Sequence, residues 1–114
     1  MTVTMYAHHD ALDKEAMAAG PPPEFHVRMK ERGHDFTETW YAADDLSSSL
    51  LVAEFGSSQD LLAHIEILEE LGYSEVVGTV FDLTTAIIGD LDDETRAAVS
   101  KYDFITVMAP SPHG

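Results

Sequence analysis

The sequence contains no cysteine among its 114 residues, which excludes disulfide bonds, thiolate metal ligands and a cysteine nucleophile. Basic residues are also scarce, because 6 lysines and arginines stand against 21 acidic residues and leave a formal net charge of −15. Such a field repels nucleic acid and anionic membranes, so we expect neither as a partner. No stretch approaches the roughly 18 apolar residues of a membrane-spanning helix. No apolar signal-peptide core is present near the start of the chain either, and these absences favour a soluble, cytoplasmic protein.

The excess of negative charge has two interpretations. It can serve solubility, including in a host with an acidic or salt-rich cytoplasm. It can also form a surface that docks on a basic protein partner, or that mimics DNA. The acidic residues are scattered and form no long runs, which favours the first interpretation.

The second half of the chain reads as two strand–helix–strand units with short connections. Strands are predicted at 50–55, 75–81, 84–88 and 104–108, and helices at 58–71 and 92–102. Ser57 and Asp92 are suitable N-caps for the two helices, and Gly72 is suitable just after the first one. His64 is expected on the solvent side of the first helix.

This order predicts an α+β protein with a ferredoxin-like βαββαβ sandwich over about residues 50–109. Residues 1–49 form an N-terminal extension of mixed helix and strand, residues 110–114 form a tail, and we expect a single domain.

The extension carries weaker signals, which predict a strand at 1–6, a helix at 10–19 and a strand at 36–41. Pro23 and Gly33 favour a helix over 24–32, because proline is typical of a helix start and glycine of a helix end. The alternation of Phe25, Val27 and Met29 fits a strand instead, so both alternatives stay open.

Several predicted strands contain consecutive apolar residues, as in Leu50–Val52 and Ala86–Ile88. A strand with one face in water alternates apolar and polar residues. Two helices cover only one face of a four-stranded sheet, so the other face needs the first 49 residues, a second subunit, or both. We therefore expect a homo-oligomer, with a dimer favoured.

One group of residues has the chemistry of an acid–base site. A histidine oriented by a carboxylate can act as a general base near neutral pH, and His34 lies close in sequence to Asp35 and Glu38. Phe36, Trp40 and Tyr41 could line a ligand pocket beside it. The alternative is a capping turn with His34 in solvent.

Two further groups are weaker candidates. Arg28 and Arg32, with Lys30 between them, form a basic patch that could bind an anionic ligand, or could simply pair with neighbouring glutamates. His8, His9 and Asp10 are metal-ligand types, but adjacent histidines on a strand point to opposite faces, so we predict no metal site. No glycine-rich phosphate loop and no G-x-S-x-G motif occurs, and the sequence indicates no cofactor.

Residues 51–73 resemble the first strand, helix and Gly-Tyr turn of several small ferredoxin-like regulatory families. The resemblance rests on the segment Leu51–Ser58, on Leu61 and Leu62 in the predicted helix, and on Gly72-Tyr73 after it. ACT domains, PII-like signalling proteins and CutA-like trimers share this plan. The resemblance implies oligomers whose sheets pack together and small effectors bound in clefts between subunits. The dimeric α+β-barrel enzymes share the fold too and imply a pocket between sheet and helices.

Three functions follow from these observations. The first is a non-catalytic accessory or regulatory protein that oligomerises and docks on a partner or small effector. The second is a small cofactor-free enzyme of the α+β-barrel type, with His34 and Asp35 or Glu38 as its acid–base pair. The third is a DNA mimic. A closed apolar cavity of roughly a few hundred cubic ångströms, with His34 pointing into it, would favour the enzyme.

Overall fold

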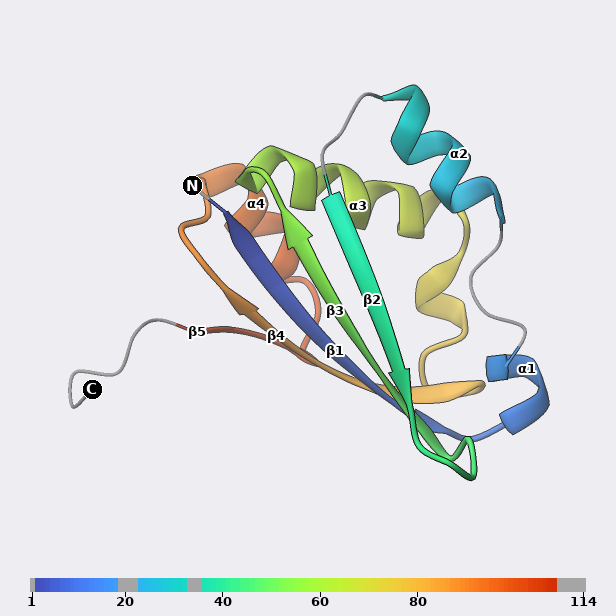
Figure 1. Ribbon diagram of the computed structural model, residues 1–114. Helices are drawn as coiled ribbons and strands as arrows, with labels where there is room; N and C mark the ends of the chain where they lie inside the picture. The colour runs from blue at the N-terminus through green and yellow to red at the C-terminus, as the bar shows by residue number, and fades with distance from the viewer. Residues whose placement is uncertain (1, 19–22, 33–35, 109–114) are drawn as a thin grey trace.

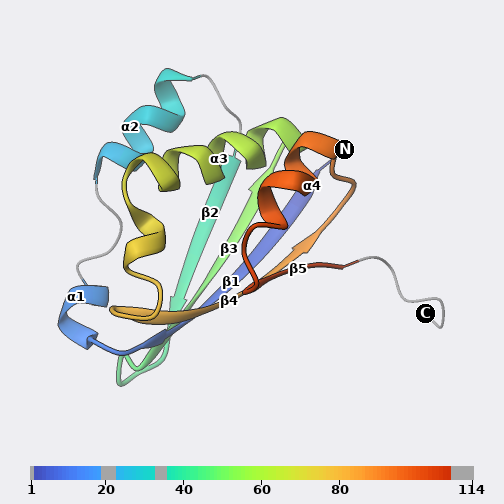
Figure 2. The ribbon, with the colours of Figure 1, turned by 180° about the vertical axis from the view of Figure 1, so that it is seen from behind.

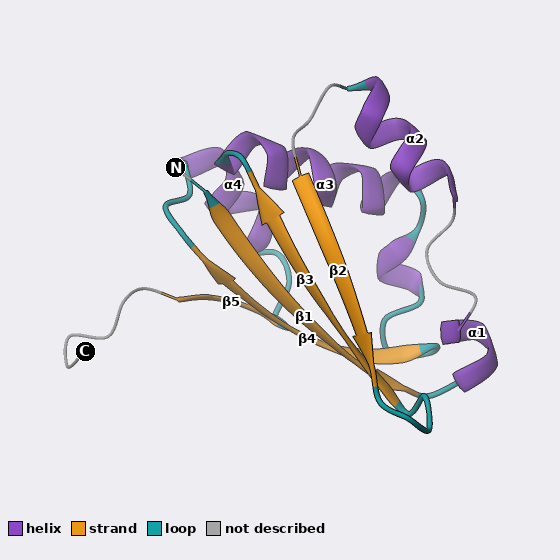
Figure 3. Ribbon diagram, viewed as in Figure 1, coloured by secondary structure: helices purple, strands orange, loops and turns teal. Residues whose placement is uncertain are grey.

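The computed structural model describes residues 2–18, 23–32 and 36–108, which form one five-stranded sheet with helices packed against it (Figure 1). The strands are β1 (Val3–Ala11), β2 (Phe36–Ala42), β3 (Ser48–Phe55), β4 (Phe81–Ile88) and β5 (Ile105–Met108). The described helices are α1 (Lys14–Ala18), α2 (Pro23–Glu31), α3 (Ser58–Glu70), α4 (Asp93–Val99) and the short 3₁₀ helix η1 (Tyr73–Glu75). The fold is therefore mixed α+β, as predicted (Figure 3).

Strand β1 lies at the centre of the sheet, whose order is β2-β3-β1-β4-β5. It pairs antiparallel with both β3 and β4, while β4 and β5 are parallel. Val3, Met5, Ala7 and His9 alternate with exposed or half-buried residues and point to the helices. The segment expected to be an N-terminal extension thus supplies two strands, β1 and β2, to the same sheet as the second half of the chain.

The prediction of two separate strands at 75–81 and 84–88 is wrong. Residues 81–88 form the single strand β4, and Asp82 and Leu83, which separate the two predicted strands, lie inside it. The connection before β4 contains η1, with Gly72 and Gly78 in left-handed conformations at φ 75° and 88°. The period-two burial of Phe81, Leu83, Thr85 and Ile87 is the pattern of one continuous strand with one buried face.

The predicted starts of the helices at 58–71 and 92–102 are correct, because each helix has an N-cap residue. Helix α3 begins after Ser57, whose hydroxyl accepts a hydrogen bond from the Asp60 N–H, and it ends one residue before the predicted boundary. Helix α4 begins after the Asp92 cap but ends at Val99, three residues before the predicted end. Residues 23–31 are helical, which confirms the helix alternative, and Phe25 and Met29 face inward.

Helix α1 is shorter than the predicted helix over 10–19. Asp10 pairs with Ser48 and Asp82 in the sheet, so it does not cap a helix, and β1 continues to Ala11. The strand β1 (Val3–Ala11) therefore extends beyond the strand that was predicted at 1–6.

All the described helices lie on one face of the sheet (Figure 2). The inner face carries the main core, which includes Met5, Leu51, Phe55 and Ile87. The outer face carries Tyr6, Val52 and Ala86 at one register position, and Ile88 and Met108 at another. We expected residues 1–49, a second subunit, or both to cover this outer face. The described part of residues 1–49 does not cover it. No described helix has the length and apolar character needed to span a membrane.

Candidate functional site

A cavity of about 810 Å³ lies between the inner face of the sheet and the helices. Its wall is mainly apolar and comes from all five strands and from α1, α2, α3 and η1. Trp40, Tyr41 and Leu46 form its rim and are 43%, 57% and 51% exposed. A volume of this size accommodates a small organic molecule.

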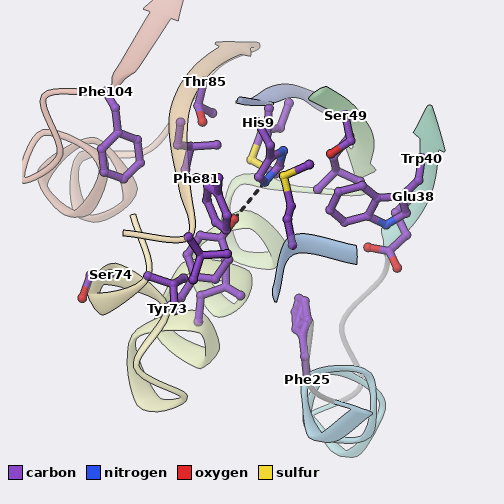
Figure 4. Close-up of a pocket in the computed structure, with 18 of the residues that line it drawn as sticks. His9, Phe25, Glu38, Trp40, Ser49, Tyr73, Ser74, Phe81, Thr85 and Phe104 are labelled. Atoms are coloured by element: carbon purple, nitrogen blue, oxygen red, sulfur yellow. Dashed lines mark hydrogen bonds between the residues drawn. The ribbon is translucent and has the colours of Figure 1, made fainter. Parts of the chain in front are cut away.

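A partly buried hydrogen bond joins the sheet to η1 in the wall of this cavity. His9 on β1 is 3% exposed, and its Nε2 lies 3.0 Å from the Tyr73 hydroxyl (Figure 4). The edge of the His9 ring meets Phe81 at 4.7 Å between centroids, and Trp40 lies at 5.4 Å. These contacts fix the imidazole against the cavity wall.

Burial sets the protonation of this pair. Desolvation lowers the pKa of His9, with a smaller contribution from His8, while the backbone of Ala7 and Ser49 acts in the opposite direction. Burial also raises the pKa of Tyr73. Both groups are therefore neutral near pH 7, and the ring can donate or accept at Nε2 according to its tautomer. The His9 Nδ1 has no partner with hydrogen-bond geometry among the described residues.

A second histidine of the cavity wall is buried within aromatic rings. His64 on α3 is 3% exposed, and its ring meets Phe25 at 4.8 Å and Phe55 at 5.1 Å between centroids. Desolvation, together with the charge of His26, lowers the pKa of His64 to about 3, so the ring is neutral. The expectation that His64 faces solvent was wrong, because α2 places Phe25 over that side of α3.

The predicted acid–base group is only partly within the described residues. Glu38 on β2 points to the inner face, lines the cavity and accepts a hydrogen bond from His26 of α2. The side chains of Glu38 and His26 are 18% and 50% exposed. His34 and Asp35 lie outside the described residues, so their proposed role stays a prediction.

The predicted ligand-binding residues separate into two groups. Trp40 and Tyr41 lie in the cavity wall, whereas Phe36 packs between the two core clusters beside Phe25 and Phe55. Arg28 and Arg32 lie away from the cavity wall.

Both arginines bind one carboxylate on α3. The Glu70 oxygens lie 3.1 Å from Arg28 and 2.7 Å from Arg32, and these bonds lower the pKa of Glu70. Their described contacts are thus those of a surface ion-pair network that links α2 to α3.

The weak metal candidates diverge, as expected for neighbours on a strand. His9 points into the cavity, while the Nδ1 of His8 lies 3.7 Å from Asp10 on the outer face. Across residues 2–18, 23–32 and 36–108 no group of three or more histidine and acidic side chains is arranged to hold a metal ion.

Sequence reasoning did not identify the His9–Tyr73 and His26–Glu38 pairs. The signal for His9 was present, because it continues the alternation of Val3, Met5 and Ala7 on one strand. Tyr73 lies 64 residues away, and only the tertiary fold reveals that contact.

No protein family and no curated protein matches the chain by sequence. Solved structures match its fold, and they include the following two. MupZ from Pseudomonas fluorescens has a TM-score of 0.72 at 12% identity, and the match covers 96% of this chain and 85% of that one. Rv0793 from Mycobacterium tuberculosis has a TM-score of 0.58 at 18% identity, covering 82% of this chain and 98% of that one. At these identities the matches establish a shared α+β fold and nothing about activity.

Proposed function

We propose that this chain is an enzyme that binds an apolar small molecule in the cavity and moves a proton on it through Tyr73 and His9. The observation that carries this proposal is the hydrogen bond between buried His9 and half-buried Tyr73, both neutral, in the wall of an otherwise apolar cavity. It corresponds to the α+β-barrel alternative from the sequence, with His9 in the role first considered for His34.

The geometry supports a relay. When the Tyr73 hydroxyl donates to Nε2 of His9, the lone pairs of the phenol oxygen are free to accept a proton from a ligand. As the ligand proton reaches the Tyr73 oxygen, the phenol proton moves to Nε2 and gives an imidazolium. The reverse transfer returns a proton to another atom of the ligand, so the net reaction is an isomerisation. Because desolvation weakens the imidazole as a base, the ligand proton must itself be acidic, as in a carbon acid beside a carbonyl group.

The strand order also supports a finer assignment of the fold. We propose that β1 to β4, with α2 and α3 as the crossover helices, form the ferredoxin-like unit of a single domain. That unit would run over 3–88, and α4 and β5 would extend it.

The outer face of the sheet supports a dimer. Tyr6, Ile88 and Met108 are 39%, 43% and 50% exposed there, beside half-buried Leu50 and Val52. An apolar sheet face of this kind is typically covered in the functional protein. A second copy of the chain, packed sheet to sheet, would cover it.

An effector-binding regulator is the alternative function, because it would use the same cavity without turning over its ligand. Proton exchange distinguishes the two. We expect the protein to accelerate deuterium uptake from D₂O into 2-tetralone, a bicyclic ketone with acidic protons beside its carbonyl group. His9→Gln and Tyr73→Phe should each reduce the acceleration by at least about tenfold, a loss typical for removing one acid–base group.

His8→Gln is the matched control, since His8 is the neighbouring histidine on the outer face, and it should leave the exchange rate unchanged. If 2-tetralone binds but exchanges no faster than in buffer, the regulator is supported. If His8→Gln slows the exchange as much as His9→Gln does, the relay is wrong.

A further inference from the structure

We infer that the ligand of this cavity is an apolar carbonyl compound that also carries an amine, and that its ammonium group binds Glu38, close to the rim residue Trp40. The inference rests on the proposed function, in that the same cavity holds the ligand, and it names the ligand's chemical class. It is carried by the position, contacts and charge of Glu38.

Glu38 is a carboxylate held in an apolar wall. Its position on β2 turns it to the same side as Trp40, two residues along the strand, and its side chain is 18% exposed. One oxygen, Oε1, accepts the hydrogen bond from His26. That bond orients the carboxylate from the α2 side, and among the described residues none donates a hydrogen bond to Oε2.

The other charged groups of the cavity wall differ from Glu38 in being exposed to solvent. Lys14 donates to the backbone oxygen of Asp45 at 3.3 Å, and Glu69 accepts a hydrogen bond from the Tyr102 hydroxyl. A carboxylate oxygen at a desolvated site is stabilised most by a cationic donor. A cationic ligand group would therefore form its most favourable interaction in this cavity with Oε2 of Glu38.

The sign of the field also selects a cation. Glu38 and Glu69 outnumber Lys14 in the wall, both buried histidines are neutral, and the whole chain carries a net charge of −15. An anionic ligand would meet repulsion both in solution and in the cavity, whereas a cation is attracted in both.

The aromatic rim suits the same ligand. Trp40 lies beside Glu38 on the same side of β2 (Figure 4), and an aromatic face attracts an ammonium group while the ring buries apolar surface. The apolar body would then extend towards Phe81 and Leu83. A hydrophobic molecule with one amine at its end fits both parts of the site.

The test uses three probes that share one ring system: 2-naphthylmethylamine, which is protonated at neutral pH, neutral 2-naphthalenemethanol, and anionic 2-naphthoate. Calorimetry should show that the amine binds the wild-type protein at least about tenfold more tightly than the alcohol, as expected for one charge-assisted hydrogen bond. The carboxylate should bind most weakly.

Glu38→Gln keeps the shape and removes the charge, so it should abolish the preference for the amine while the alcohol binds as before. Glu38→Met is a second variant of similar size, and circular dichroism establishes that each is folded. Glu54→Gln is the matched control, because Glu54 is an exposed glutamate on the neighbouring strand β3. It changes the net charge equally and should retain the preference.

The outcomes separate this inference from the proposed function. If the amine and the alcohol bind equally to the wild-type protein, or if Glu54→Gln lowers the preference as much as Glu38→Gln, the inference is wrong and the cavity remains a ligand site. If none of the probes binds while 2-tetralone still exchanges faster than in buffer, the inference is wrong and the proposed function stands; if 2-tetralone neither binds nor exchanges faster, both are wrong.

Discussion

The hydrogen bond between His9 and Tyr73 gives a quantitative prediction for Tyr73→Phe. The substitution removes one hydroxyl and leaves Nε2 of His9 without its partner at a residue that is 3% exposed and whose Nδ1 already lacks one. An unsatisfied buried polar group costs about 1–3 kcal/mol. Because His9 borders a cavity that water can enter, we expect the lower half of that range, about 1.5 kcal/mol. For a chain of this length the loss corresponds to a melting temperature about 6 °C lower.

A double-mutant cycle isolates the pair. His9→Leu alone should also destabilise the protein, because it removes the partner of the half-buried Tyr73 hydroxyl. The double variant His9→Leu/Tyr73→Phe removes both polar groups, so it should be less destabilised than the sum of the single variants by about 1 kcal/mol or more. Urea unfolding measures all four free energies under identical conditions. If the two substitutions are additive within about 0.3 kcal/mol, the two side chains do not interact and the acid–base pair is wrong.

Three other predictions follow from burial and charge. His64 has a pKa of about 3 in the folded protein and an ordinary value of 6.5, so the unfolded chain binds an extra proton as the pH falls through this window. Stability should therefore fall between about pH 7 and 5, and His64→Leu should flatten that slope in urea titrations at several pH values. Val52→Asp on the outer face of the sheet should convert a dimer into a 12.5 kDa monomer in light scattering, whereas Val27→Asp, at an exposed position on α2, should not. A monomeric wild-type protein would contradict this prediction. About 1 M KCl should raise the melting temperature, because screening relieves the repulsion among 15 excess negative charges, and an unchanged value would mean that these charges are compensated locally.

The sequence predicted the helices best, because their ends depend on local chemistry. Ser57 and Asp92 both cap as expected, and Pro23 marks the start of α2. The strands were harder, since pairing depends on residues far apart in the chain. Residues 75–88 contain enough apolar residues for two short strands, and only pairing with β1 along its whole length shows that Phe81–Ile88 is one strand.

The candidate site was predictable only in part for the same reason. Trp40 and Glu38 were identified from their types and spacing, and both line the cavity. Their partners come from distant segments: the sheet brings His9 beside Trp40, and α2 brings His26 to Glu38. Spacing along the chain cannot show contacts between elements, so the sequence grouped Glu38 with nearby His34.

Trp40 is the single tryptophan of the chain, and it lies at the cavity rim in contact with His9. The intrinsic fluorescence of the protein therefore comes mainly from one indole at the proposed binding site. A molecule that enters the cavity displaces water from that ring and changes its emission. The protein thus carries its own optical reporter of occupancy, and a library of unlabelled compounds can be screened against it without knowledge of the reaction.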